Sequence, residues 1–219
     1  MTAEPPHSPA TEGVRSLEVR WIFPGQLETA VARWFSRFPA ATESREDTYL
    51  VDPQLRGLSV KVRAGRVLEV KAYRGGRGIL QVPGRARGRL EAWQKWSFPF
   101  SPPRLDSAGP AGWQPVRKRR RISRFSRASG PAAARVPVPG GEPWCAVELT
   151  EVRTRGQDWW TLGFEATGPA DLLHSELQAT AALVFAQPLP AGVEPHPDYS
   201  RSYAEWLGRP PGAESDAGT

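Results

Sequence analysis

The sequence is poor in the side chains that most often build metal cages and redox centres. Its single cysteine, Cys145, excludes an internal disulfide framework and a cysteine metal cage. Cys145 lies in an apolar stretch, which favours a buried, inert thiol over a nucleophile. The three histidines, His7, His174 and His196, are far apart in the chain, so they suggest neither a histidine metal triad nor a Ser-His-Asp arrangement.

Long apolar runs are missing as well. No stretch approaches the roughly eighteen consecutive apolar residues of a membrane-spanning helix. Residues 1–15 also lack the positively charged start and apolar run of a secretory leader. These absences predict a soluble, cytoplasmic protein with no membrane partner, and they leave its oligomeric state open.

The composition is typical of a folded protein with extended loops. Of the 219 residues, 39% are hydrophobic, including nine Trp and eight Phe, whereas the 23 Pro and 21 Gly favour loops and tails. We predict one domain over residues 16–208, between disordered tails at 1–15 and 209–219. Long Pro- and Gly-rich loops are expected near 101–115 and 127–143, because neither flank of either segment holds enough strands for a second core.

The charge balance favours an anionic partner. The formal net charge is +6 and the isoelectric point is about 10.0. A nucleic acid, a polyphosphate compound or an acidic surface would each be attracted to such a protein. The same Arg-rich, Lys-poor usage also arises from a GC-rich genome, so the charge alone names no ligand.

Charged and apolar residues alternate in the segments 17–21, 59–63 and 68–72. Successive side chains of a strand point to opposite faces, so each segment places its charges on one face. An antiparallel sheet with one solvent-exposed face would show the same pattern. A charged surface enclosed by a barrel is the alternative, and the number of further strands favours it.

The predicted fold class is mainly β (α+β): a closed, eight-stranded antiparallel barrel or tunnel with a few packing helices. The expected strands are 16–23, 47–51, 57–63, 66–73, 89–98, 117–125, 144–152 and 159–167. Helices are expected at 26–38, 170–185 and 200–207. Eight strands enclose just enough space for side chains or one small ligand.

Enclosed charges of both signs must pair with one another or bind ions. A phosphate-rich ligand with a divalent cation would satisfy both signs together. Lysine and arginine would contact phosphate oxygens, and carboxylates would hold Mg²⁺ or Mn²⁺ as hard oxygen ligands.

A series of short segments follows a characteristic order along the chain. They are Glu18-x-Arg20, Asp47-Thr48-Tyr49-Leu50, Leu58 to Arg63, Leu68 to Lys71, Val116 to Arg120, Gly163 to Ala166 and Ser202 to Leu207. This order resembles the CYTH superfamily, which contains the triphosphate tunnel enzymes. That family has a Glu-x-Glu-x-Lys strand, a "D-x-Y-L" strand, strands with phosphate-binding basic residues, and an "S-Y-x-x-L" segment near the C-terminus. The resemblance spans residues 17–207.

The resemblance and the strand alternation together assign candidate roles to nine residues. Phosphate would be bound by Arg20, Lys61, Arg63, Lys71, Lys118 and Arg120. A divalent metal would be held by Glu18, Glu148 and Glu165, although each of these could equally pair with a neighbouring arginine. A register shift of one residue would replace Lys118 and Arg120 by Arg119 and Arg121, and a solvated basic edge strand would also explain this run.

The departures from the family pattern concern catalysis more than fold. The first strand reads Glu18-Val19-Arg20-Trp21-Ile22, so Arg20 stands where the family has its second glutamate and Ile22 where it has lysine. A guanidinium has no acceptor and cannot bind a cation. Thr167 stands where a further glutamate is expected after Glu165. No catalytic residue is assigned for this reason.

Three functions are therefore compatible with the sequence. The leading interpretation is a tunnel that binds a linear phosphate-rich anion, such as a nucleoside triphosphate or tripolyphosphate, with metal-dependent phosphohydrolase activity left open. The second is a catalytically inactive binding or interaction protein of the same fold. The third is sequence-independent nucleic-acid binding through the Arg-rich strand and loops.

Overall fold

The structure is a computed structural model that describes residues 13–55, 57–100, 112–126, 130–132 and 142–209. Its strands are β1 (Val14–Pro24), β2 (Ala41–Leu50), β3 (Leu58–Arg63), β4 (Val67–Val82), β5 (Ala86–Pro99), β6 (Trp113–Ser126), β7 (Gly130–Ala132), β8 (Trp144–Thr154) and β9 (Gln157–Thr167). Its helices are α1 (Thr29–Phe35), α2 (Leu173–Val184), the 3-10 turn η1 (Pro197–Tyr199) and α3 (Tyr203–Leu207).

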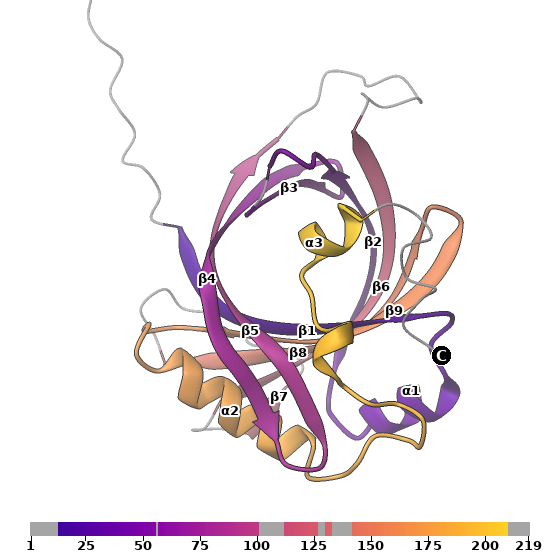
Figure 1. Ribbon diagram of the computed structural model, residues 1–219, viewed down its shortest axis with the longest axis vertical. Coiled ribbons are helices and arrows are strands. Elements are labelled where there is room, and N and C mark those ends of the chain that lie inside the picture. Colours follow the sequence, from indigo (N-terminus) through magenta and orange to yellow (C-terminus); the bar gives the residue numbers. More distant parts are fainter. Residues whose placement is uncertain (1–12, 56, 101–111, 127–129, 133–141, 210–219) are drawn as a thin grey trace, which may run out of the picture.

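Eight of these strands close into an antiparallel barrel. Hydrogen bonding runs in the order β2-β3-β4-β5-β1-β9-β8-β6, and β6 pairs back onto β2. The short strand β7 pairs with the end of β6 beyond the ring. Figure 1 looks into the ring formed by the eight strands. The predicted closed, eight-stranded antiparallel barrel with packing helices is confirmed.

Several element boundaries differ from the prediction. The strand β4 continues to Val82, although the glycines after Tyr73 were expected to end it. Its pairing with β5 shifts register on both sides of Gly76, and Gly75 and Gly78 have positive φ values of 105° and 87°. Glycine permits such bulges, so the strand bends and continues where the sequence pattern suggested a loop.

Two other strands are longer because their pairing depends on distant segments. The strand β2 begins at Ala41 rather than at residue 47, and its added part pairs with the Arg-rich part of β6. The strand β6 begins at Trp113, within the predicted loop 101–115, and β7 lies within the predicted loop 127–143. Residues 101–111, 127–129 and 133–141 of these loops, and the predicted tails except for residues 13–15 and 209, lie outside the described residues.

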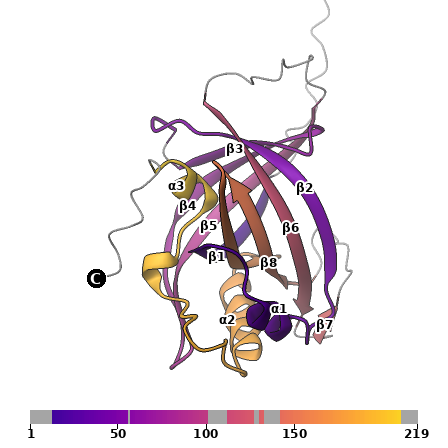
Figure 2. The same cartoon turned by 90° about the vertical axis from the view of Figure 1, so that its right-hand side faces the viewer.

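The main apolar core lies on the outer side of the barrel wall. On β1, Leu17, Val19, Trp21 and Phe23 are buried on the face opposite Glu18 and Arg20, and they share one apolar cluster with α1 and α2. Figure 2 shows both helices against one side of the barrel. The alternation that points apolar residues outward to the helices therefore points charges inward. Cys145 is fully buried in this cluster, as predicted.

A second, smaller apolar cluster closes part of the interior. It combines Ile22, Tyr49, Val116 and Val152 of the strands with Trp206 and Leu207 of α3. The views in Figures 1 and 2 place α3 across one opening of the barrel. The short C-terminal helix thus restricts the interior from one end. No helix within the described residues is long and apolar enough to cross a membrane.

Candidate functional site

A cavity inside the barrel is lined mainly by charged side chains. Ten of its lining residues are lysine or arginine and five are glutamate. The space open to the centres of water-sized molecules is only about 90 Å³. One water needs roughly 10–15 Å³ by this measure, so the free space holds only about six to nine water molecules. A ligand would have to displace water and compete with existing ion pairs.

The nine candidate residues all line this cavity. They are Arg20, Lys61, Arg63, Lys71, Lys118 and Arg120, with Glu18, Glu148 and Glu165. The register of the basic strand is the predicted one. The side chain of Lys118 is only 3% exposed, whereas those of Arg117 and Arg119 are 77% and 58% exposed on the outer face.

Lysine is confined to the cavity. The chain has four lysines, Lys61, Lys71, Lys95 and Lys118, and all of them line it. Arginine supplies the positive charge elsewhere in the sequence. A genome-driven preference for arginine would explain that background, but it would not explain why every lysine lines one cavity. Lysine and arginine are not interchangeable, because an ammonium is a compact point charge whereas a guanidinium is a planar fork of donors.

The first group of ion pairs centres on Glu148. Arg20 Nη1 lies 3.3 Å from Glu148 Oε1 and donates a hydrogen bond of 2.9 Å to Thr161 Oγ1. Arg120 pairs with the other oxygen of Glu148, and Thr150 donates a hydrogen bond of 2.6 Å to Oε1. Burial alone would raise the pKa of Glu148, but Arg120 and Arg20 hold it well below its usual range.

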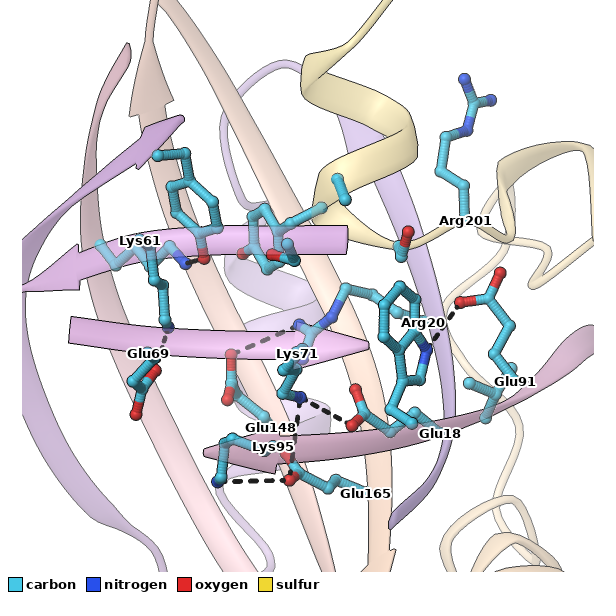
Figure 3. A pocket seen from close by; sticks show the side chains of 18 of the residues that line it. Glu18, Arg20, Lys61, Glu69, Lys71, Glu91, Lys95, Glu148, Glu165 and Arg201 are labelled. Atoms are coloured by element: carbon cyan, nitrogen blue, oxygen red, sulfur yellow. Dashed lines mark hydrogen bonds and ion pairs between the residues drawn. The ribbon is translucent and has the colours of Figure 1, made fainter. Parts of the chain in front are cut away.

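The second group centres on Lys71, as Figure 3 shows. Its Nζ lies 2.6 Å from Glu18 Oε1 and 3.9 Å from Glu165 Oε1, and Lys95 Nζ also lies 3.9 Å from Glu165. Lys71 and Lys95 are direct cross-strand neighbours. Burial alone would raise the pKa of Glu165, but Lys71 and Lys95 lower it to about 2. Glu165 is therefore ionised at neutral pH.

The third group surrounds the fully buried Asp47. Its carboxylate lies 3.1 Å from Lys61, 3.3 Å from Lys118 and 3.0 Å from Arg45. Lys118 also donates a hydrogen bond of 2.6 Å to Tyr49 Oη. Burial and the nearby ammonium of Lys61 hold the pKa of Lys118 well below its usual range. The "D-x-Y-L" segment thus positions a cavity lysine.

Sequence reasoning missed several lining residues. Lys95 lies on a strand for which no inward charges were assigned, although Glu91, Trp93 and Lys95 alternate along it. Arg45 lies in the part of β2 that has no apolar alternation. Tyr203 lies on a helix predicted without a position relative to the barrel. The spacing of Glu91, Trp93 and Lys95 was the one local signal available.

The carboxylates do not fit a divalent cation in this arrangement. Glu18, Glu148 and Glu165 come from β1, β8 and β9. Glu18 and Glu148 accept hydrogen bonds from Lys71 and Arg20, and Glu165 has the ammonium groups of Lys71 and Lys95 3.9 Å away. No three His, Cys, Asp or Glu side chains in the described part of the chain form a group able to hold a metal ion. A carboxylate that accepts ammonium or guanidinium hydrogens cannot direct the same lone pairs to a metal.

Comparisons with known proteins identify no family. No family model matches the chain, and no curated protein matches it. A solved structure of a conserved hypothetical protein from Pyrococcus furiosus is similar, with a TM-score of 0.43 and 17% sequence identity. The match covers 86% of this chain and 98% of that chain.

Proposed function

We propose that the barrel binds a linear phosphate-rich anion, such as tripolyphosphate or a nucleoside triphosphate. The observation that carries the proposal is the lining of ten basic and five acidic side chains, which includes every lysine of the chain. The buried Asp47 also pairs with Arg45, Lys61 and Lys118, but the basic side chains still outnumber the carboxylates. An excess of enclosed positive charge is costly until an anion is bound. Phosphate oxygens accept several charge-assisted hydrogen bonds at once, which suits a ring of ammonium and guanidinium donors.

Lys95 and Lys71 are the donors best placed for such a ligand, although Lys71 would share its ammonium with Glu18, which already accepts a hydrogen bond of 2.6 Å from it. Both lie 3.9 Å from Glu165, which is beyond hydrogen-bond length. A phosphate oxygen placed between the two ammonium groups would give each a closer partner than Glu165 provides. Because little free space exists, ligand entry would require these side chains to exchange partners.

The resemblance to the triphosphate tunnel enzymes supports the same ligand class. The closed eight-stranded barrel is the fold that the resemblance implies, and the predicted basic residues share one cavity. The metal-dependent phosphohydrolase activity of that family is less well supported, because lysines and arginines occupy the carboxylates that would hold Mg²⁺ or Mn²⁺. Binding without turnover is therefore the function we favour.

The outer face of the barrel supports nucleic-acid binding less strongly than the cavity supports phosphate binding. Arg117, Arg119 and Arg153 are exposed there. Each lies within 3.7 Å of a carboxylate, those of Glu46, Glu151 and Asp158 respectively. This pairing offsets much of the positive charge that a nucleic-acid backbone would need.

Calorimetric titration with tripolyphosphate tests the proposal. We expect Lys95→Ala to weaken binding about tenfold or more, because it removes a charge-assisted contact worth roughly 1.5–3 kcal/mol. Arg117→Ala is the matched control, since it removes one positive charge from the outer face. It should change the affinity less than about twofold. Equal effects of the two substitutions would place the anion outside the cavity.

A phosphate-release assay separates binding from catalysis. Tripolyphosphate and nucleoside triphosphates would be incubated with the native protein and with Glu165→Gln, with and without Mg²⁺ or Mn²⁺. We expect no turnover in any condition. Metal-dependent turnover that Glu165→Gln abolishes would instead establish the phosphohydrolase.

A further inference from the structure

We propose that Arg20 is a built-in cation in the place of a divalent metal, so that the cavity binds its phosphate ligand free of metal. This inference rests on the proposed function and deepens it by naming the ionic form of the ligand. The free polyphosphate would bind, and its magnesium complex would not.

The guanidinium of Arg20 lies directly against the backbone of β9. Arg20, Gly163 and Glu148 are cross-strand neighbours on β1, β9 and β8. A Cβ atom on Gly163 would lie only 2.8 Å from Arg20 Cζ and 2.9 Å from Nη2. Gly163 has no positive φ, so its backbone conformation does not require glycine. Glycine fits this position because the guanidinium occupies the space that a Cβ atom would need.

Three further contacts fix the charge at this point. Glu148 and Thr161 both bind Nη1, and Cζ lies 4.9 Å from the centre of the Tyr203 ring. The side chain of Arg20 is 15% exposed and lines the cavity. No hydrogen bond uses Nε or Nη2 within the described residues. These groups remain to donate to an oxygen of a ligand, and Figure 3 shows Arg20 among the other charged residues of the cavity.

A permanently charged guanidinium at this position changes which ligand form is favourable. A phosphate that arrives as a magnesium complex would bring a second cation close to Arg20 and Lys71, where like charges repel. The carboxylates could bind that cation only by releasing their present partners. The free anion brings negative charge alone, and Arg20 donates to it without any rearrangement of Glu148.

Calorimetry in two buffers tests this inference on the native protein. Tripolyphosphate would be titrated first in a metal chelator and then with Mg²⁺ in excess over the ligand. We expect binding in the chelator and an apparent affinity at least about tenfold weaker with Mg²⁺, because complexed ligand is withdrawn from the equilibrium. Binding that strengthens with Mg²⁺ would overturn the inference while leaving the proposed function intact. Failure to bind in either buffer would overturn the proposed function itself.

Manganese binding provides a second readout that needs no phosphate. Electron paramagnetic resonance measures free Mn²⁺ in the presence of the native protein, Arg20→Glu and the matched neutral variant Arg20→Gln. We expect only Arg20→Glu to reduce the free signal, because it adds a carboxylate beside Glu18 and Glu148. Stoichiometric Mn²⁺ binding by the native protein would contradict the inference, as would a folded Arg20→Glu variant that binds none. The native titration remains decisive if Arg20→Glu does not fold.

Discussion

Replacing Gly163 by alanine should destabilise the barrel through a side chain on the neighbouring strand. The added Cβ would lie 2.8 to 3.0 Å from three atoms of the Arg20 guanidinium, which is closer than atoms can approach without movement. The guanidinium of Arg20 would therefore have to move, which would lengthen or break its hydrogen bonds to Glu148 and Thr161. Glu148 keeps Arg120 and Thr150 as partners, so the carboxylate does not become an isolated buried charge.

The magnitude follows from these contacts. Hydrogen bonds to a charged group contribute roughly 1.5–3 kcal/mol, and alanine recovers roughly 0.5–1 kcal/mol of backbone entropy relative to glycine in a strand. We expect the free energy of unfolding to fall by about 1–2 kcal/mol. For a domain of this size, that corresponds to a decrease of roughly 2–8 °C in melting temperature.

The assay is thermal and urea denaturation followed by circular dichroism. Gly76→Ala is the matched control, because Gly76 also lies in a strand without a positive φ and its added Cβ would meet only Tyr73 Oη at 3.5 Å. This control should be neutral or slightly stabilising. If Gly163→Ala were as stable as Gly76→Ala, the guanidinium would not be held at Gly163.

Three further predictions concern the ion pairs of Glu148 and Glu165 and the packing of α3 in one opening of the barrel. Glu148→Gln removes the carboxylate that Arg20 and Arg120 share, whereas Arg120 keeps Glu43 as a partner, so we expect a loss of about 3 kcal/mol in urea denaturation. Inorganic phosphate should then raise the melting temperature of the variant more than that of the native protein, and equal shifts would argue against an anion at this position. The folded pKa of Glu165, about 2, lies below its ordinary value of 4.5, so its stabilisation is complete above about pH 5 and is lost as the pH falls toward 2. At about 1.4 kcal/mol per pH unit, Glu165→Gln should cost up to about 3 kcal/mol at pH 7 and less than about 0.5 kcal/mol at pH 2. A cost that does not change with pH would contradict this explanation. Trp206→Ala removes the largest side chain that α3 adds to the inner apolar cluster, and it should lower the free energy of unfolding by about 3 kcal/mol in the same assay. A variant as stable as the native protein would mean that α3 does not pack in the opening.

The barrel was predictable because its signal is local. Alternation along β1 separates Glu18 and Arg20 from the apolar residues beside them, and the same rule places Lys118 inside and Arg117 outside. Each of these assignments needs only the period of a strand. The extra length of β4 was not predictable in this way, because its glycines form bulges that depend on pairing with β5.

The partners of the site residues could not be predicted from the sequence. Which cations meet Glu148 depends on the register of four neighbouring strands, β1, β9, β8 and β6. The close approach of Arg20 to Gly163 becomes visible only when β1 lies beside β9. The contribution of Tyr203 requires α3 to fold across the opening. All of these are contacts between residues distant in the chain, which local patterns do not encode.

The most direct test of phosphate binding in the cavity uses the lysines as reporters, because every lysine of the chain lines the cavity. Protein labelled with ¹³C only at lysine gives signals from Lys61, Lys71, Lys95 and Lys118, and all four line the cavity. Titration with tripolyphosphate in a metal chelator should shift the signals of Lys71 and Lys95 in a saturable manner with one equivalent of ligand. Tripolyphosphate that binds by calorimetry while all four lysine signals stay unchanged would contradict the account.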